Sequence, residues 1–183
     1  MSRLLTLSLL LLLSCVGCSS NSARQASYQY NTIIVNKQFR CSPAAAIKRE
    51  MLALINKARS QPRSCGKQRF PGVAPLTWNA ALKAAAADHS LDMARGDFFS
   101  HSGSDDSDVS NRVDAAGYEW RRVGENLYGG AERSEQAVRG WLRSPAHCRN
   151  IMNPDFKQMG AACARNSASK YGTYWTQVLA TAL

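Results

Sequence analysis

Apolar residues recur every three or four positions after residue 43, which is the spacing of a helix with one buried face. The stripe begins at Ile47 and ends at Ala58. Ser42 is placed to cap this helix, Pro43 suits its first position, and Pro62 is placed to stop it. We therefore expect a first core helix that starts at Pro43.

A second helical stripe runs from Trp78 to Met93 and ends at Gly96. The alanine run from Ala84 to Ala87 permits the close approach of a neighbouring element. His89 lies on the apolar stripe of this expected helix. We interpret His89 as a core histidine with a satisfied hydrogen bond rather than as a ligand.

The acidic segment Ser104-Asp105-Asp106-Ser107-Asp108 superficially resembles a calcium-binding loop. It lacks the central glycine and the terminal glutamate of that pattern. We interpret the segment instead as the capped start of a short helix that stops at Gly117.

A further helix is expected from Ser134, which we take as its cap, to the break before Pro145. Beyond Pro154, the runs Met159–Ala164 and Tyr171–Ala180 indicate two strands that form a hairpin. Helices followed by short strands, without alternating crossover units, predict an α+β fold.

The first residues have the pattern of a secretory signal sequence. Arg3 supplies a positive charge, and Leu4–Leu13 is an apolar run too short to span a bilayer and remain there. The run leads into Cys15-Val16-Gly17-Cys18, which resembles a bacterial lipobox, although Cys15 stands where such boxes usually have Leu. We expect cleavage after Gly17 and lipidation of Cys18. A box at Cys15 and an ordinary secretory cleavage are the alternatives.

This assignment divides the chain into a signal peptide at 1–17, a tether at 18–40 and one domain at 41–183. The tether is rich in Ser, Asn and Gln, which is typical of a flexible linker. Ser19, rather than Asp, after the lipidated cysteine resembles an outer-membrane address in a cell with two membranes. We expect an exported, lipid-anchored protein, with free secretion as the alternative.

The remaining cysteines are even in number, which agrees with export to an oxidising compartment. They are Cys41, Cys65, Cys148 and Cys163. A helix between Cys41 and Cys65 would be about 25 Å long, and the residues after it reach back at most about 17 Å, so we disfavour that pairing. We favour Cys65 with Cys148 and Cys41 with Cys163. No short paired spacing favours zinc binding by these cysteines.

Loss of Arg3 with the signal peptide leaves 22 of the 23 basic residues against 13 acidic ones, a formal charge of +9. In an exported protein this charge indicates anionic envelope polymers or lipid headgroups rather than nucleic acid as partners, or it serves solubility alone, which is the interpretation we favour. The sequence does not indicate an oligomeric state.

An acidic residue, Glu125, stands between Val123 and Leu127, where an apolar residue is expected. His101 lies 24 residues before it and His147 lies 22 residues after it. A carboxylate and two imidazoles form a set that zinc accepts, with a fourth position for water. The alternative is a hydrogen-bonded network that pins loops onto a sheet without any metal.

Eight short motifs occur in the order seen in bacterial members of the CAP superfamily, the SCP-like group of cysteine-rich secretory proteins, antigen 5 and pathogenesis-related proteins. They cover about Ala44 to Ala182 and are Leu54-Ile55-Asn56-Lys57-Ala58-Arg59, Leu76-Thr77-Trp78-Asn79, Phe99-Ser100-His101, Gly117-Tyr118, Val123-Gly124-Glu125-Asn126-Leu127, Trp141-Leu142-Arg143-Ser144-Pro145-Ala146-His147, Asn150-Ile151-Met152 and Tyr174-Trp175-Thr176-Gln177. The resemblance implies an α-β-α sandwich with a central antiparallel sheet and a surface cleft.

The resemblance implies that, in eukaryotic members, this cleft carries two His and two Glu and sometimes binds zinc. His101 matches the first His and Glu125 matches the Glu of the Gly-Glu-Asn motif. Ser144 stands here at the position of the second Glu. The other His precedes a Thr-Gln pair in those members, and here Tyr174-Trp175 precedes that pair instead. The eukaryotic set is therefore incomplete.

We expect an envelope-anchored binding module rather than an enzyme, with a cell-envelope component or a small hydrophobic ligand as its partner. The ligand would reach a cleft at His101, Glu125 and His147, and Tyr174 and Gln177 would line the same cleft. One alternative is a metal-dependent hydrolase of peptides or cell-wall material, with zinc at His101, Glu125 and His147. Another is a protein that binds lipids or sterols, as some relatives do.

Overall fold

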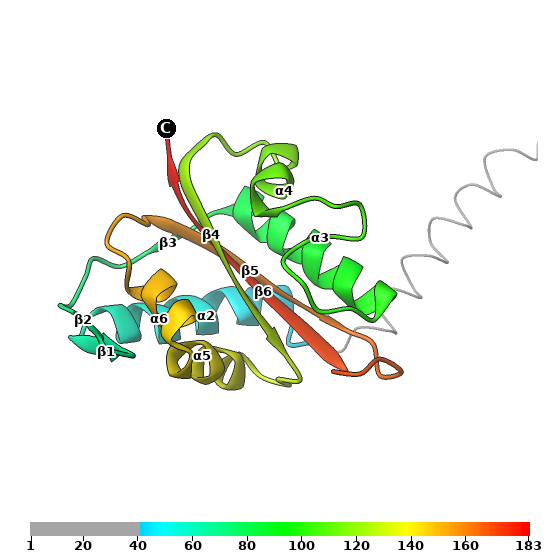
Figure 1. The fold of residues 1–183 in the computed structure, drawn as a ribbon, viewed down its shortest axis with the longest axis horizontal. Helices are drawn as coiled ribbons and strands as arrows, with labels where there is room; N and C mark the ends of the chain where they lie inside the picture. The colour runs from blue at the N-terminus through cyan, green and yellow to red at the C-terminus, as the bar shows by residue number, and fades with distance from the viewer. Residues whose placement is uncertain (1–40) are drawn as a thin grey trace, which may run out of the picture. The chain divides into compact units, whose positions relative to one another are not determined.

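The computed structural model describes residues 41–183, so the expected signal peptide, the expected lipidation site at Cys18 and the expected tether lie outside the described residues. The described residues form three layers, with helices on both faces of a four-stranded sheet (Figure 1). The strand order is β3 (Thr77–Trp78), β5 (Gln158–Arg165), β6 (Thr173–Ala182) and β4 (Trp120–Gly129). The expected α+β class is confirmed.

The sheet departs from the expected pattern at one edge. Strand β6 pairs antiparallel with both β5 and β4, as expected, and β5 and β6 are the expected hairpin. The short strand β3 is instead parallel to β5. Strand β4 forms the opposite edge of the sheet, and it carries Glu125.

One helical layer contains α3 (Ala80–Gly96) and α4 (Val109–Ala115). Asn79 caps α3 by accepting hydrogen bonds from the backbone N–H groups of Ala81 and Leu82. Helix α3 lies unusually close to β5. A Cβ atom added at Gly160 would stand 2.1 Å from the backbone nitrogen of Lys83, so this close approach requires glycine. Asp108 caps α4, and Gly117 takes a positive φ after it, as the sequence predicted.

The other helical layer contains α2 (Ala44–Arg59), α5 (Ser134–Arg143) and α6 (Pro145–Met152), beside a small hairpin of β1 (Arg63–Cys65) and β2 (Gln68–Phe70). Two predicted caps are wrong. Pro43 rather than Ser42 occupies the N-cap of α2. Ser134 lies inside α5, where its buried hydroxyl has no partner among residues 41–183. Helix α6 was not predicted, since Pro145 both ends α5 and starts α6.

Successive side chains of a strand point to opposite faces of its sheet. On β6, Trp175 and Leu179 therefore pack with α2, α5 and α6, whereas Val178 and Ala180 pack with α3. The sheet thus separates two apolar cores. This division decides which side chains can meet at the edge strand β4.

Two disulfide bonds cross-link the described residues, in the pairing that the sequence favoured. Cys41 is bonded to Cys163, with 5.8 Å between Cα atoms, and Cys65 is bonded to Cys148, with 5.4 Å between Cα atoms. The second bond fixes the small hairpin to α6. No helix within residues 41–183 is long and apolar enough to cross a membrane.

Candidate functional site

Glu125 lies near the middle of β4, and its side chain points toward the layer of α3 and α4. The side chain is only 3% exposed. Its Oε1 accepts a hydrogen bond of 2.7 Å from His101 Nδ1, and its Oε2 accepts one of 2.8 Å from Arg112 Nη2. Because a carboxylate only accepts, Nδ1 carries the proton of the His101 ring. Both oxygens of Glu125 are therefore engaged.

Arg112, on α4, ties the loop before it to this carboxylate. Its guanidinium donates to the backbone oxygen of Ser107 at 2.7 Å and to that of His101 at 3.1 Å. The side chain is 9% exposed, so its ion pair with Glu125 is largely shielded from water. Arg112 holds both the His101 loop and the Glu125 carboxylate in place.

His101 lies in the loop after α3 and is the accessible member of the group. Its side chain is 63% exposed. With Nδ1 bonded to Glu125, the ring is held by one edge, and Nε2 remains for a ligand. A buried carboxylate that orients an exposed imidazole fixes the tautomer and direction of the ring.

His89, on α3, is buried beside the same carboxylate, with its Nε2 4.0 Å from Glu125 Oε1. Nε2 donates to the backbone oxygen of Ser100 at 2.8 Å, and Nδ1 has no partner within the described residues. Burial lowers the pKa of His89, and the Glu125 charge opposes that shift. His89 is thus a core histidine, as expected, but it is only half satisfied and belongs to the site.

His147 does not join the network that the sequence predicted. It lies on α6, in the opposite helical layer, and its ring makes no hydrogen bond within residues 41–183. Burial lowers the pKa of His147, and the nearby charge of His101 lowers it further. Glu125 is therefore bonded to His101 and not to His147.

The next residue of β4, Asn126, faces α6 and forms a second polar group. Its Nδ2 donates to Gln177 Oε1 at 2.9 Å and to the backbone oxygen of His147 at 3.3 Å. Its Oδ1 accepts from Asn150 Nδ2 at 2.9 Å. This group pins α6 to the sheet and has no contact with solvent at Asn126.

Tyr174 and Gln177 do not line a cleft, because both side chains are fully buried. Tyr174 packs with Met93 and Leu127. Its hydroxyl donates to Asp97 Oδ1 at 2.7 Å, which lowers the pKa of Asp97, and burial raises the pKa of Tyr174. Gln177 serves the Asn126 group. Both residues lie on β6, within the strand that the sequence predicted. Because side chains alternate between the two faces of the sheet, Tyr174 and Gln177 point into the cores on opposite sides of it.

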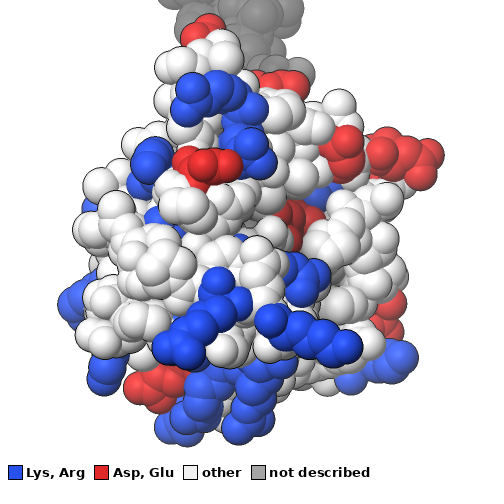
Figure 2. Space-filling view, turned by 60° about the vertical axis from the view of Figure 1, so that its left-hand side comes forward, with Lys and Arg blue, Asp and Glu red and all other residues white. Residues whose placement is uncertain are grey.

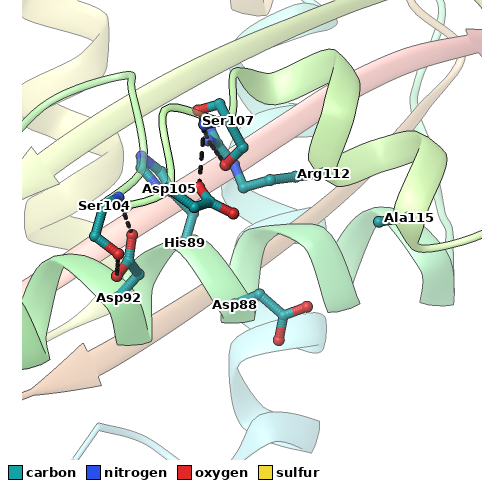
Figure 3. Close-up of a pocket in the computed structure, with 8 residues that line it drawn as sticks. All are labelled: Asp88, His89, Asp92, Ser104, Asp105, Ser107, Arg112 and Ala115. Carbon is teal, nitrogen blue, oxygen red and sulfur yellow. Dashed lines mark hydrogen bonds between the residues drawn. The ribbon is translucent and has the colours of Figure 1, made fainter.

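A pocket of about 270 Å³ opens between α3, the 104–107 loop and α4 (Figure 3). Asp92, His89 and Arg112 are among the side chains that line it. Figure 3 shows the Asp92 carboxylate turned to Ser104, which donates to it through both its backbone nitrogen and its hydroxyl. The loop that carries the site is thus tied to α3 as well as to α4.

Two exposed aromatic rings contact one another near the loop that carries His101. The Phe99 and Tyr171 rings have centroids 5.1 Å apart and planes tilted by 48°, and the two residues are 42% and 36% exposed. The Tyr171 ring lies against Gly129 at the end of β4. An exposed aromatic pair therefore includes Phe99, two residues before the exposed imidazole in the same loop.

Comparison with known proteins identifies the family and agrees with the fold. The sequence model of CAP, the cysteine-rich secretory protein family, matches residues 52–179. The chain belongs to the CAP family. Glu125, His101, Arg112 and His89 all lie within the matched region of this CAP domain.

Among curated proteins, the CAP domain is similar to the uncharacterized protein YkwD of Bacillus subtilis, at 26% identity over 136 residues. That match covers 74% of this chain and 48% of YkwD. The chain therefore spans about half the length of this relative.

Among solved structures, an extracellular protein containing an SCP domain from Bacillus anthracis aligns with a TM-score of 0.61 at 23% identity, covering 75% of this chain and 41% of that one. An outer surface protein from Borrelia burgdorferi aligns with a TM-score of 0.58 at 15% identity, covering 74% of this chain and 90% of that one. At these identities, both likenesses show the fold alone.

The zinc site of some eukaryotic CAP proteins does not fit the residues of this chain. Both Glu125 oxygens accept hydrogen bonds, with donor–acceptor distances of 2.7–2.8 Å, and Oε2 faces the positive guanidinium of Arg112. Within residues 41–183, no three His, Cys, Asp or Glu side chains are placed to hold a metal ion. The guanidinium occupies the position next to the carboxylate that a cation would need.

Proposed function

We propose that this CAP protein is an extracytoplasmic binding module whose ligand contacts His101, and that it does not turn its ligand over. The observation that supports this most strongly is the engagement of both Glu125 oxygens. Each oxygen accepts one of these bonds, and the side chain is only 3% exposed, so the carboxylate offers little surface to a substrate or a water. It acts as a support for the imidazole.

The supporting residues leave one polar contact and one apolar contact for a ligand. His101 offers Nε2, which accepts a hydrogen bond when the ring is neutral and donates one when it is protonated. Phe99, two residues earlier, offers an exposed ring in contact with that of Tyr171. A cell-envelope component with a flat, partly apolar face and a polar group matches these two contacts.

Placement at the envelope is part of the proposal. Lipidation at Cys18 would hold the domain to a membrane through residues 18–40. The domain would then meet envelope polymers close to the bilayer. Free secretion remains the alternative consequence of the signal sequence.

A test uses soluble peptidoglycan glycan fragments as the probe. We expect saturable changes in the NMR signals of Phe99 and His101, and we expect the fragments to be recovered with unchanged mass. His101→Ala should abolish the changes, whereas Ser102→Ala, in the same exposed loop, should preserve them. Failure of any glycan fragment or small apolar ligand to perturb His101 would contradict a binding site there.

Hydrolysis is the second candidate, because a buried carboxylate that orients an imidazole is also the arrangement of a general base. The mass analysis of the same samples separates the two functions. New products that disappear in Glu125→Gln would establish turnover. The lipid-binding alternative depends on the Phe99 and Tyr171 pair, which with the terminal Leu183 are the exposed large apolar side chains of residues 41–183.

A further inference from the structure

A second pocket, of about 200 Å³, lies between the end of β4 and α5, in the helical layer opposite to His101. Side chains of Tyr128, Gln136, Arg139 and Arg143 line it. Arg139 and Arg143 are one helical turn apart, so their side chains extend from the same face of α5. Neither forms an ion pair with a carboxylate within residues 41–183.

The polar groups available in this pocket are donors. The Gln136 carbonyl is already used, since it accepts from the backbone nitrogens of Glu132 and Arg133. The amide N–H groups of Gln136 remain to donate hydrogen bonds to a ligand in the pocket. The backbone oxygen of Ala131 is likewise taken, by the side chains of Thr173 and Trp175. Two guanidinium groups, an amide and the Tyr128 hydroxyl are left without a matching acceptor.

The glycine at position 140 lets the Tyr128 ring lie directly against α5. Gly140 lies between the two arginines, and the Tyr128 ring fills the space that a side chain there would occupy, since a Cβ added at Gly140 would stand 2.0 Å from Tyr128 Cε2. The ring is therefore held against α5 between Arg139 and Arg143. Like charges four residues apart destabilise a helix, and a bound anion relieves that repulsion.

The charges of the two helical layers have opposite signs. Helices α2, α5 and α6 carry seven basic and two acidic side chains, whereas residues 80–115, which include α3 and α4, carry seven acidic and three basic ones. Figure 2 shows Lys and Arg side chains gathered at the lower end of the molecule, the end where α5 lies in Figure 1. A negatively charged partner is therefore drawn to the layer that contains the pocket.

We propose that the pocket of Tyr128, Gln136, Arg139 and Arg143 binds a phosphoryl group. Several oxygens on one tetrahedral anion match several donors around one pocket, and guanidinium groups bind phosphate oxygens in pairs. The pocket lies on the other side of the sheet from His101, so this proposal does not depend on the function proposed for that residue.

The test follows the amide NMR signals of Gly130 and Gly140 while inorganic phosphate replaces chloride at constant ionic strength. We expect saturable shifts whose Kd rises at least about tenfold in the double variant Arg139→Gln and Arg143→Gln, because two charge-assisted contacts are lost. The matched control, Arg49→Gln with Arg149→Gln, removes the same charge from the same layer outside the pocket. Its Kd should stay within about twofold of the parent value.

Two results would overturn the proposal. One is an absence of saturable shifts with phosphate in the parent protein. The other is an equal weakening in the pocket variant and the control, which would reduce the effect to the overall charge of the layer.

Vesicles distinguish the two sources of the phosphoryl group. Binding to phosphatidylcholine vesicles that contain phosphatidylglycerol, but not to phosphatidylcholine alone, with loss only in the pocket variant, supports a lipid headgroup. Phosphate binding by the pocket without vesicle binding supports a soluble or polymeric phosphate instead.

Discussion

Glu125 and Asn126 are consecutive residues of one strand whose side chains hold opposite helical layers. Glu125 bonds to His101 and Arg112 on the side of α3 and α4. Asn126 bonds to Gln177 and Asn150 on the side of α6. The alternation of an edge strand therefore gives the two neighbours separate tasks.

This division predicts separate effects for two substitutions. Glu125→Gln leaves the shielded Arg112 without its counter-charge and should lower the free energy of unfolding by about 3–5 kcal/mol. Hydrogen exchange should rise in the 100–108 loop and α4 but not in α6. Asn126→Ala should show the reverse pattern, with faster exchange in α6.

The control for both is Glu119→Gln, since Glu119 is exposed just before β4. It should change stability by less than about 0.5 kcal/mol. Faster exchange in both layers for either core variant would show that the two polar groups act as one.

Arg59 is a second residue whose role depends on distant parts of the chain. It is fully buried at the end of α2, where burial lowers its pKa to about 10. Its guanidinium donates to the backbone oxygens of Ala74, Ile151 and Asn153 at 2.6–2.9 Å. It thus joins α2 to the end of α6.

Arg59→Lys should lower the free energy of unfolding by about 2–4 kcal/mol, because one ammonium group cannot serve all these carbonyls and those left are buried. Urea denaturation measures the effect. Arg49→Lys, at a position 75% exposed on the same helix, should be nearly neutral. A small effect at Arg59 would mean that water replaces the missing donors.

The buried histidines predict how stability depends on pH. The pKa of His89 is lowered by burial, and that of His147 is lowered by burial and then by His101. The folded protein therefore binds fewer protons than the unfolded chain below about pH 6.5, so its stability falls as the pH decreases through that value. His89→Gln, whose amide can still donate to Ser100, should reduce the loss between pH 7 and pH 5.

Carboxylates affect the stability at lower pH than the histidines do, so they do not obscure this test. Hydrogen bonds from Tyr174, Ser107 and Ser110, respectively, lower the pKa values of Asp97, Asp105 and Asp108 below 3.8. Their contribution is present above about pH 4 and is lost below it. Denaturant midpoints across pH 5–7 check the histidine term. An unchanged pH profile in His89→Gln would assign the dependence to other groups.

The sequence predicted the long helices, the hairpin of β5 and β6 and the pairing of cysteines, because each depends on local periodicity or on simple reach. It did not predict β4 as a strand, although Val123, Glu125 and Leu127 alternate with Gly124 and Asn126. Reading that alternation would have placed Glu125 and Asn126 on opposite faces.

The site was predicted only in part for the same reason. His101 and Glu125 do meet, whereas the similar spacing of His147 carries no information about the side of the sheet on which it lies. Arg112 gave no local signal, since an arginine on the polar side of a short helix is ordinary. His89 was placed correctly in the core, but its proximity to Glu125 depends on how α3 packs against the sheet.

The central claim is that Glu125 supports His101 through a network completed by Arg112, rather than through a metal ion. The most direct measurement is the melting temperature of the protein with excess zinc and with chelator, since a metal that binds only the folded state must raise it. We predict the same melting temperature in both. A clear rise with zinc that is lost in His101→Ala and in His147→Ala would contradict the account and establish a metal site.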